Sequence, residues 1–523
     1  MFGQWKYQVS FRRGDGVAFG EEDGVSAGYM DGAAGSLTVT STDKTGRDFR
    51  AHGRLQYTGE HYLQFAETNG YFLKCGTDAP ENFLAYNEID NTPNVEGLRK
   101  IWKDHAIDYD PDADEFLWGQ KRQKGKNILG AINYLSQKGM NAFSFLTFNV
   151  DGDDKNVFPH LLKVSAEDYE QAYSEEDAEH LVIEGEEEPS YHQWEESVCH
   201  DRFDVSKLDQ WEQIFCYAEM KGMFLHFKTQ EEENDRKMDG GNMGPERKLY
   251  YRELIARFAH HLGLNWNLGE ENQQTIEQLK EAAAFIAEND PYGHLIVFHT
   301  YPMNYDERYK PFLGSQSVLT GLSIQTSEPD FSNVHSIVKK WVKASAAAGK
   351  KWVVACDEPG DAEHSLLPDQ EDPEHNNARI NGLWGALMAG GCGTEWYFGY
   401  QHAHSDLTCE SWRSRDLFWD QCRIALDFFK EYHVPVSEMK SMDELTRPED
   451  DFVFALPGKV YLVYARTGGV IDLNLPDTGY HIKWYNPRTG EMKAISEVTS
   501  KLQITFHCPS QQDWLLYLDK RSH

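Results

Sequence analysis

Basic residues are scarce in this sequence relative to acidic ones. The 523 residues include 51 Lys and Arg against 85 Asp and Glu, which gives a formal net charge of −34 at pH 7. An acidic surface of this kind repels nucleic acids and anionic membranes, so binding to DNA or RNA is not expected. Solubility in a salty or extracellular setting and steering of a cationic ligand are both compatible with the charge.

Long apolar runs are also absent. No stretch of 18 or more apolar residues occurs, so we expect neither a transmembrane helix nor insertion into a membrane. The first ten residues, MFGQWKYQVS, lack the basic-then-apolar pattern of a signal peptide. Because they already have the character of a strand, we expect Met1 to lie within a longer natural product.

Recognisable metal-binding motifs are missing. The eight cysteines show no CxxC spacing, which argues against a zinc site and a dense disulfide framework. Asp151, Asp153 and Asp154 cluster in NVDGDDKN, but the glycine comes too early for an EF-hand and no glutamate follows at the required offset. His226 and His299 lack zinc spacing with a third ligand. We therefore expect no metal and no cofactor.

Both ends of the chain contain short alternating segments typical of antiparallel β-structure. WKYQVSF and GSLTVTS near the start are divided by Gly and Asp turns, which predicts a small β-sandwich over residues 1–66. Near the other end, segments such as FVFAL, KVYLVYAR and WLLYLD are separated by turn signals such as PDTG and PRTG. These predict a C-terminal β-sandwich over residues 443–523.

Between these ends, apolar runs alternate with helical stretches. Each run starts with apolar or β-branched residues and finishes in polar ones, and amphipathic segments with a period of 3.6 residues follow. The eight runs are YFLKCGTDAP, NAFSFLTFNV, GMFLHFKTQE, LNWNLGEEN, HLIVFHTYP, GLSIQTS, KWVVACDEPG and GTEWYFGY. Eight alternations predict an α/β fold, a (β/α)8 TIM barrel, over residues 67–442.

The polar ends of the eight runs are the candidate site. In such barrels the chemistry lies at the carboxyl ends of the strands, so these side chains are expected to converge on one pocket. Two long segments, one after Asn82 and an acidic, unstructured one over 163–198, are expected on the same face. The candidate binding residues are Asp78, Asn149, Gln230, Glu270, His299, Tyr301, Gln325, Glu395 and Trp396, and the candidate catalytic residues are Glu271 and Glu358.

Two opposed carboxyl groups are the minimum for hydrolysing an acetal. One must protonate the leaving oxygen, and the other must trap or stabilise an oxocarbenium-like centre. Glu271 ends the fourth run and Glu358 the seventh, so their side chains can face each other across the barrel mouth. Asp357 is expected to point away from Glu358 along an extended chain and to orient the following loop.

The fourth run resembles a motif of retaining glycosidases. Trp266-Asn-Leu-Gly-Glu-Glu-Asn272 is similar to the W-x-x-G-N-E ending of strand four in the large clan built on (β/α)8 barrels. The resemblance assigns the acid/base role to Glu271 and the nucleophile to Glu358. Glu270 stands where the clan has an Asn. Because of this difference, Glu270 could be the acid itself, or it could be a residue that raises the pKa of Glu271. The resemblance also makes Trp396 a sugar-stacking candidate; Tyr301 and Tyr397 are further aromatic candidates.

Longer stretches carry a resemblance over nearly the whole chain. GAINYLSQKGMNAFSFLTFNVDGDDKNVFPH, RFDVSKLDQWEQIF, ERKLYYRELIARFAHHLGLNWNLGEEN and LWGALMAGGCGTEWYFGY resemble a bacterial family of glycoside hydrolases. That family has an N-terminal immunoglobulin-like domain, an apiosidase-like barrel and a C-terminal β-sandwich labelled "putative collagen-binding". The resemblance implies a secreted or periplasmic enzyme of polysaccharide degradation; the N-terminal domain is shorter here than in the family.

Two functions from different classes remain at this point. The first is a retaining glycoside hydrolase acting on a plant or algal polysaccharide or oligosaccharide. Neutral or lightly charged galactans and related glycans are the leading candidate substrates, because the strand ends have few basic residues that could bind an anionic glycan. The second is a carbohydrate-binding protein without activity on the same scaffold. Nothing in residues 450–523 supports collagen binding, and the oligomeric state is not predicted.

Overall fold

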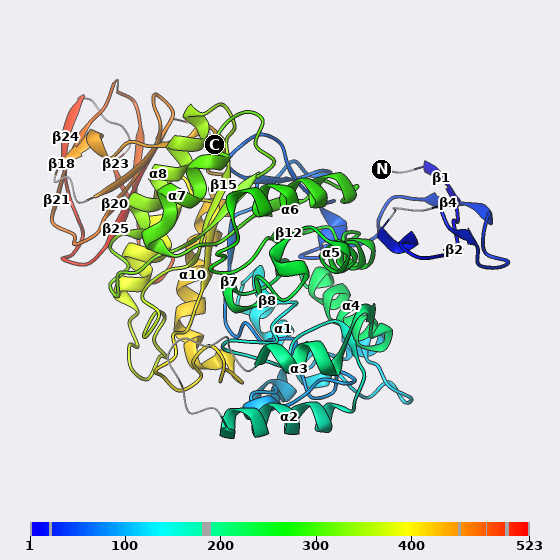
Figure 1. Ribbon diagram of the computed structural model, residues 1–523. Helices are drawn as coiled ribbons and strands as arrows, with labels where there is room; N and C mark the ends of the chain where they lie inside the picture. Colours follow the sequence, from blue (N-terminus) through cyan, green and yellow to red (C-terminus); the bar gives the residue numbers. More distant parts are fainter. Residues whose placement is uncertain are drawn as a thin grey trace.

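The computed structural model describes residues 3–19, 23–179, 190–447, 451–476, 478–496 and 502–520. Three parts follow one another along the chain: an N-terminal arm, a barrel of alternating strands and helices, and a C-terminal β-domain (Figure 1). The arm and the β-domain lie on opposite sides of the barrel in this view.

Eight parallel strands form the barrel. They pair in chain order, and the last strand returns to pair with the first. The ring closes between the fifth and sixth strands, where Thr320 N donates to Ile296 O at 3.1 Å. Each of the eight predicted runs supplies one strand, so the predicted barrel is confirmed. The strands are β7 (Lys74–Thr77), β8 (Ala142–Leu146), β11 (Phe224–Lys228), β12 (Leu264–Asn267), β13 (Leu295–Val297), β14 (Gly321–Gln325), β15 (Val353–Glu358) and β16 (Gly393–Trp396).

Helices surround this ring because each presents an apolar stripe to the strands. Side-chain caps mark the start of two of them: Asp204 accepts from Ser206 N and Lys207 N at the start of α4, and Thr275 and Gln278 form a capping box on α6. The outer helices are α1 (Lys126–Gln137), α4 (Val205–Met220), α5 (Pro245–Phe258), α6 (Ile276–Asn289), α7 (Tyr305–Tyr309), α8 (Val334–Ala347), α9 (Trp384–Met388) and α10 (Asp416–Glu431).

The acidic segment after the second strand is more ordered than expected. It contains β9 (His160–Leu162), α2 (Ala166–Glu179), α3 (Ser190–Ser197) and β10 (Val198–Phe203), and part of the predicted loop, residues 180–189, lies outside the described residues. Buried Trp194 packs edge-on against Phe148 and His160, with ring centroids 4.9 and 5.0 Å apart. The expectation of an unstructured loop is therefore wrong for the described part.

The N-terminal segment differs from the expected sandwich. β1 (Gly3–Gln8) pairs only with β4 (Ala34–Val39), and β2 (Arg12–Arg13) only with β3 (Val25–Ser26), which makes an exposed arm. β5 (Leu55–Tyr57) and β6 (Leu63–Phe65) form a hairpin that belongs to the barrel, because Leu55 N donates to Leu262 O at 2.7 Å. Within residues 3–19 and 23–66, two facing sheets do not form.

The C-terminal β-domain packs one sheet against the barrel. Alternation along β19 buries Phe452 and Phe454 with the barrel helices and Val453 between the two sheets. Arg379, buried in the barrel, forms a 2.9 Å ion pair with Asp513 of this domain. The larger sheet has β17 (Lys440–Ser441), β19 (Phe452–Leu456), β20 (Val460–Ala465), β25 (Trp514–Asp519), β22 (His481–Tyr485) and β23 (Met492–Ser496), and the smaller has β18 (Thr446–Arg447), β21 (Val470–Asn474) and β24 (Gln503–His507).

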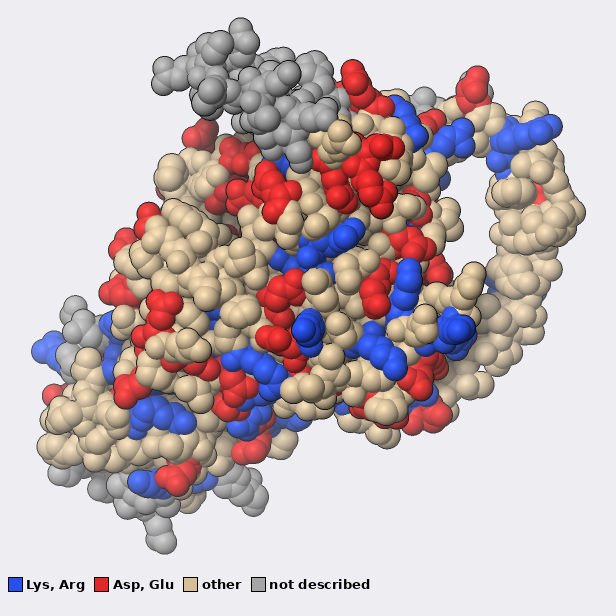
Figure 2. Space-filling model, turned by 90° about the horizontal axis from the view of Figure 1, so that it is seen from below, with Lys and Arg blue, Asp and Glu red and all other residues tan. Residues whose placement is uncertain are grey.

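The surface carries both signs of charge. On the face drawn in Figure 2, Asp and Glu side chains are spread widely with Lys and Arg between them, and the N-terminal arm forms an open arc at the edge. Among the described residues, every helix is too short or too polar to cross a lipid bilayer.

Candidate active site

Two glutamates meet at the carboxyl end of the barrel strands. Gln325 Nε2 donates to Glu271 Oε1 at 2.6 Å and to Glu358 Oε1 at 3.0 Å. These two bonds limit the separation of the carboxylate oxygens to less than about 6 Å, compared with roughly 5–5.5 Å between the carboxyl groups of retaining glycosidases and roughly 6.5–9.5 Å in inverting ones. The sequence-predicted pair is thus brought together, and Gln325 bridges it.

Irregularities in the backbone set the direction of both glutamate side chains. Glu271 has a φ of 45°, in the left-handed region that non-glycine residues rarely adopt and that is enriched at functional sites. At the end of β15 the pairing register shifts between Ile324 and Gln325, so that Gln325 lies opposite Glu358. Regular alternation would send Asp357 and Glu358 to opposite faces, but this irregularity leaves both on the inside of the barrel.

Asp357 therefore does not orient a surface loop. Its Oδ1 lies 2.5 Å from Lys74 Nζ, and its side chain is 2% exposed. The expectation from simple alternation is wrong here, because the irregular pairing at the strand end changes the direction of one residue.

Burial raises the pKa values of both catalytic candidates. The pKa of Glu271 rises to about 7, mainly through burial and next through the nearby Glu358 carboxylate. The pKa of Glu358 also rises to about 7, mainly through burial, but the Lys228 ammonium opposes that rise more than any other group. His299 Nε2 lies 3.2 Å from Glu358 Oε2. The cation therefore favours ionisation of Glu358.

A buried lysine contacts three carboxyl groups below the Glu271–Glu358 pair. Lys228 is inaccessible to solvent, with its Nζ 2.8 Å from Asp78 Oδ1, 2.9 Å from Glu81 Oε1 and in direct contact with Glu270 Oε2. The pKa values of Asp78 and Glu270 are raised well above normal by burial, whereas that of Glu81 is lowered because Lys228 and a hydrogen bond from Glu270 outweigh burial. Burial thus opposes ionisation of Asp78 and Glu270, whereas the contact with Lys228 favours ionisation of Glu81.

Sequence reasoning missed Lys228 and Glu81. The available signal was a lysine within the strand-like run GMFLHFKTQE, because a lysine buried in a strand needs an acidic partner.

A second polar layer lies deeper in the barrel. Lys74 Nζ is 3.2 Å from Glu395 Oε2, and the same oxygen is 2.5 Å from His226 Nδ1. Glu395 is fully buried in this layer. It supports the barrel interior and does not line the mouth, contrary to the expectation that it contacts substrate.

Trp396 also lies away from the mouth. It follows Glu395 in β16 and points outward, where it is fully buried against Phe331 and Phe418, with ring centroids 5.7 and 4.5 Å away. The predicted stacking role is therefore wrong for Trp396. Tyr397, which directly follows β16, is half-buried; burial is the main cause that raises its pKa, and the charges of Asp406, Glu358 and Glu81 add to the rise. Tyr397 therefore lies close enough to Glu358 for that charge to act on it.

The remaining predicted residues divide into two groups. Tyr301 lies at the mouth: its hydroxyl donates to Glu232 Oε2 at 2.6 Å and it also hydrogen-bonds Glu271. Asn149 and Gln230 are fully buried in polar networks behind the mouth. Asn149 Nδ2 donates to Glu231 Oε2 at 2.6 Å. Gln230 accepts from the Arg247 guanidinium through its side chain and from Glu270 N, at 2.8 Å, through its carbonyl.

Additional acidic residues surround the mouth. Burial raises the pKa of Glu233 to about 7, with Asp153, Glu232 and Glu271 adding to the rise. The pKa of Glu231 is raised well above normal by burial and by its acidic neighbours. A surface groove next to them is lined by Glu232, Glu233, Asp235, Arg236, Gly240, Gly241, Gln273, Gln274, Thr275 and Gln278.

Distances alone would allow a metal ion in three interior groups, which are Asp78, Glu81 and Glu270; His226, Asp357 and Glu395; and Glu270, His299 and Glu358. Lys228 already supplies a cation to the first group and Lys74 to the second. The third contains the proposed nucleophile, with His299 beside it.

Comparison with solved structures gives the same architecture. A structure described as a "putative glycoside hydrolase" from Bacteroides vulgatus matches with a TM-score of 0.62 and 17% identity, over 99% of this chain and 88% of that one. A glycoside hydrolase family 5 protein from the same organism matches with a TM-score of 0.59 and 13% identity, over 91% and 95% of the two chains. At these identities the likeness establishes the fold.

One family model matches the C-terminal part of the chain. Residues 438–519 match a family described as "Putative collagen-binding domain of a collagenase". This agrees with the C-terminal domain that the sequence resemblance implied. A search of curated proteins finds no match.

Proposed function

We propose that the chain is a retaining glycoside hydrolase in which Glu271 and Glu358 carry the reaction. The observation that supports this most directly is the Gln325 side chain, which hydrogen-bonds both carboxylates and so limits the gap between them. A gap of this size admits a sugar carbon attacked by one carboxylate while the other protonates the leaving oxygen. The two structural neighbours described as glycoside hydrolases add support through their common architecture.

Glu271 is the acid/base in this proposal. Its pKa of about 7 keeps it largely protonated below neutral pH, so it can donate a proton to the departing glycosidic oxygen. Once that proton has left, Glu271 is ionised and can accept a proton from the water that hydrolyses the glycosyl–enzyme intermediate. Tyr301 hydrogen-bonds Glu271 and holds its carboxyl group in place.

Glu358 is the nucleophile. Its carboxylate attacks the anomeric carbon, forms an ester and releases the leaving group, and water then breaks that ester with overall retention of configuration. The nearby Lys228 ammonium favours the ionised form that attack requires. Gln325 and His299 position its two oxygens separately.

Glu270 has a supporting role in this proposal. Its carboxyl group is buried against Lys228 and Glu81, below the Glu271–Glu358 pair. This contact favours Glu271 over Glu270 as the acid. A protonated Glu270 hydrogen-bonded to Glu81 holds the lysine cluster together and leaves the positive charge of Lys228 available to Glu358.

The proposed substrate is a neutral or lightly charged plant or algal glycan. Carboxyl groups of Glu232 and Glu233 lie around the mouth and, when ionised, would repel sulfate or uronate groups. For the C-terminal domain we propose a structural role, because one face of its larger sheet is buried against the barrel.

The test is hydrolysis of a panel of plant and algal polysaccharides and oligosaccharides, with NMR following the anomer first released. Glu271→Gln and Glu358→Gln are expected to lose activity by at least about 10²-fold, and Glu363→Gln, which changes an exposed glutamate after β15, is the control. Inverted product, or full activity in either catalytic variant, contradicts the mechanism. Binding without turnover across the panel would favour a carbohydrate-binding protein.

A further inference from the structure

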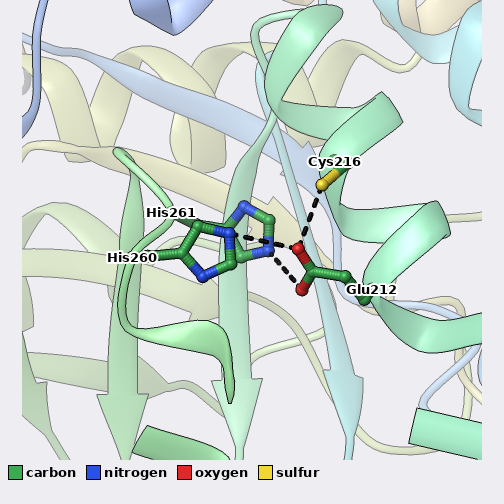
Figure 3. Close-up of side chains that lie close together, drawn as sticks. All are labelled: Glu212, Cys216, His260 and His261. Atoms are coloured by element: carbon green, nitrogen blue, oxygen red, sulfur yellow. Dashed lines mark hydrogen bonds and ion pairs between the residues drawn. The ribbon is translucent and has the colours of Figure 1, made fainter. Parts of the chain in front are cut away.

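A mixed cluster of potential metal ligands lies on the opposite face of the barrel from the proposed active site. Glu212 and Cys216 are one turn apart on α4, and His260 and His261 occupy the turn between α5 and β12. Figure 3 shows the two imidazole rings and the two α4 side chains pointing toward one another. One donor atom from each of the four residues lies within 4.8 Å of all the others.

One ring nitrogen of His260 faces a carbonyl, and the other faces a carboxylate. Its Nδ1 lies 2.8 Å from Arg257 O, and because a carbonyl only accepts, Nδ1 carries the proton. In the neutral ring Nε2 is then a bare lone pair, yet it lies 3.1 Å from Glu212 Oε1. Two acceptors at this distance repel each other unless a cation or a second proton lies between them.

His261 is in a similar position. Its Nε2 lies 3.2 Å from Glu212 Oε2, and its Nδ1 lies 3.6 Å from Glu219 Oε2. Leu262 N donates to that Glu219 oxygen at 2.5 Å and fixes it beside the ring. A carboxylate behind the second nitrogen is the usual support of a metal-bound histidine.

Three donors lie around the Glu212 carboxylate at slightly less than the distance between neighbouring ligands of a tetrahedral ion. Cys216 Sγ lies 3.1 Å from Glu212 Oε1, similar to the two histidine–carboxylate distances. Around Zn²⁺, bond lengths of about 2.0–2.3 Å place neighbouring N, O and S ligands roughly 3.3–3.6 Å apart. Small side-chain adjustments would therefore be enough to accommodate the ion.

We propose that Glu212, Cys216, His260 and His261 bind Zn²⁺ as a structural site. A thiolate and a carboxylate would neutralise the charge of the ion, and two imidazoles would complete four-coordination. His260 is half exposed, which gives the ion a path of entry, whereas His261 is buried. The ion would link α4 to the α5–β12 turn at the amino-terminal end of the strands, where barrel residues serve stability and not chemistry.

The sequence alone does not reveal this site. Its ligands form an E-x3-C segment and a His-His pair more than forty residues apart, and neither matches a zinc motif. Only the packing of α4 beside the turn after α5 brings the two halves together. The alternative for the same contacts is a metal-free cluster in which a protonated His261 pairs with Glu212 and Glu219: burial lowers the pKa of His261, but its contacts with these two carboxylates outweigh burial and raise the pKa to about 9.

Metal titration of the full chain separates these two states. The protein is stripped with a chelator, desalted and titrated with Zn²⁺ against a chromophoric competitor, and a parallel sample is loaded with Co²⁺. We expect one Zn²⁺ per chain, a higher midpoint of thermal unfolding with Zn²⁺, and a cobalt spectrum with a thiolate charge-transfer band and tetrahedral d–d bands.

Variants assign the ligands. Cys216→Ser is expected to weaken Zn²⁺ binding by at least about 100-fold and to abolish the thiolate band. His260→Gln, at a half-exposed position, should also weaken binding. Cys508→Ser, which removes another half-buried thiol in the C-terminal domain, is the matched control and should bind as the parent does. Unchanged affinity in Cys216→Ser and His260→Gln, or no binding at micromolar free Zn²⁺, would overturn the proposal.

Discussion

Replacing Lys228 by methionine tests the electrostatics beneath the proposed active site. Lys228 is inaccessible to solvent and its Nζ contacts Asp78, Glu81 and Glu270. Because Asp78 and Glu270 have raised pKa values and Glu81 a lowered one, the substitution leaves one buried carboxylate, Glu81, without its cation. We therefore expect the barrel to lose stability and the pH dependence of activity to change together.

The expected loss follows from the burial of the pair. Removing one partner of a buried ion pair costs about 3–5 kcal/mol, mostly because the other charge stays buried and unpaired. Lys228→Met should therefore lower the free energy of unfolding by that amount at pH 7. The double variant Lys228→Met/Glu81→Gln removes both charges and should lose less than the two single variants together.

Urea unfolding and pH–rate profiles are the two assays. Since Lys228 lowers the pKa of Glu358, its removal should raise that pKa and move the acidic limb of kcat/KM to higher pH. Lys74→Met is the control, because Lys74 is also buried but pairs with Asp357 and Glu395 in the deeper layer. A loss below about 1 kcal/mol, or equal shifts of the acidic limb in both variants, would refute the reasoning.

Three further outcomes are expected. Burial and Glu358 raise the folded-state pKa of Glu271 from its ordinary 4.5 to about 7. Stability that is present below pH 4.5 is therefore lost as the pH rises through 7. Glu271→Gln should remove about 1–3 kcal/mol of that pH-dependent loss, measured by urea unfolding at pH 4.5 and 8. Trp396→Ala should destabilise the barrel by about 3–5 kcal/mol in the same assay, because its ring is fully buried. Tyr397→Ala should instead mainly lower kcat/KM. The opposite pattern would indicate that Trp396 is the residue that stacks on the sugar. Asp513→Ala leaves the buried Arg379 without its ion-pair partner and should lower the free energy of unfolding by about 3–5 kcal/mol. Faster proteolysis of the C-terminal domain is the check. Unchanged proteolysis would show that this contact does not hold the two domains together.

The barrel could be predicted from sequence because its signal is repeated eight times. Each strand is an apolar run with a polar end, amphipathic segments follow the strands, and two of the helices also begin with a capping residue, Asp204 and Thr275. The N-terminal segment gave a misleading signal, since β1 and β4 alternate as a sandwich strand would but pair only with each other. Local alternation predicts a strand and leaves its partners undetermined.

The direction of individual side chains was harder to predict. Glu395 and Trp396 are adjacent in a regular strand, so they cannot both face the mouth, and in fact neither does: one enters the deep ion network and the other the outer core. Asp357 and Glu358 are adjacent too, but an irregular pairing turns both inward. A β-irregularity depends on the neighbouring strand, so a single strand sequence does not reveal it.

The buried lysines explain how the barrel can hold two carboxyl groups with raised pKa values, Glu271 and Glu358, at its mouth. Lys74 holds Asp357 and Glu395 in the deep layer, and Lys228 holds the layer above it, so each layer contains its own cation. At the mouth the dominant effects on Glu271 are burial and the Glu358 carboxylate, both of which raise its pKa. The cation of the upper layer acts on Glu358. Burial raises both pKa values to about 7, and the fixed positive charge below the mouth opposes that rise at Glu358, where the proposed nucleophile has to be ionised.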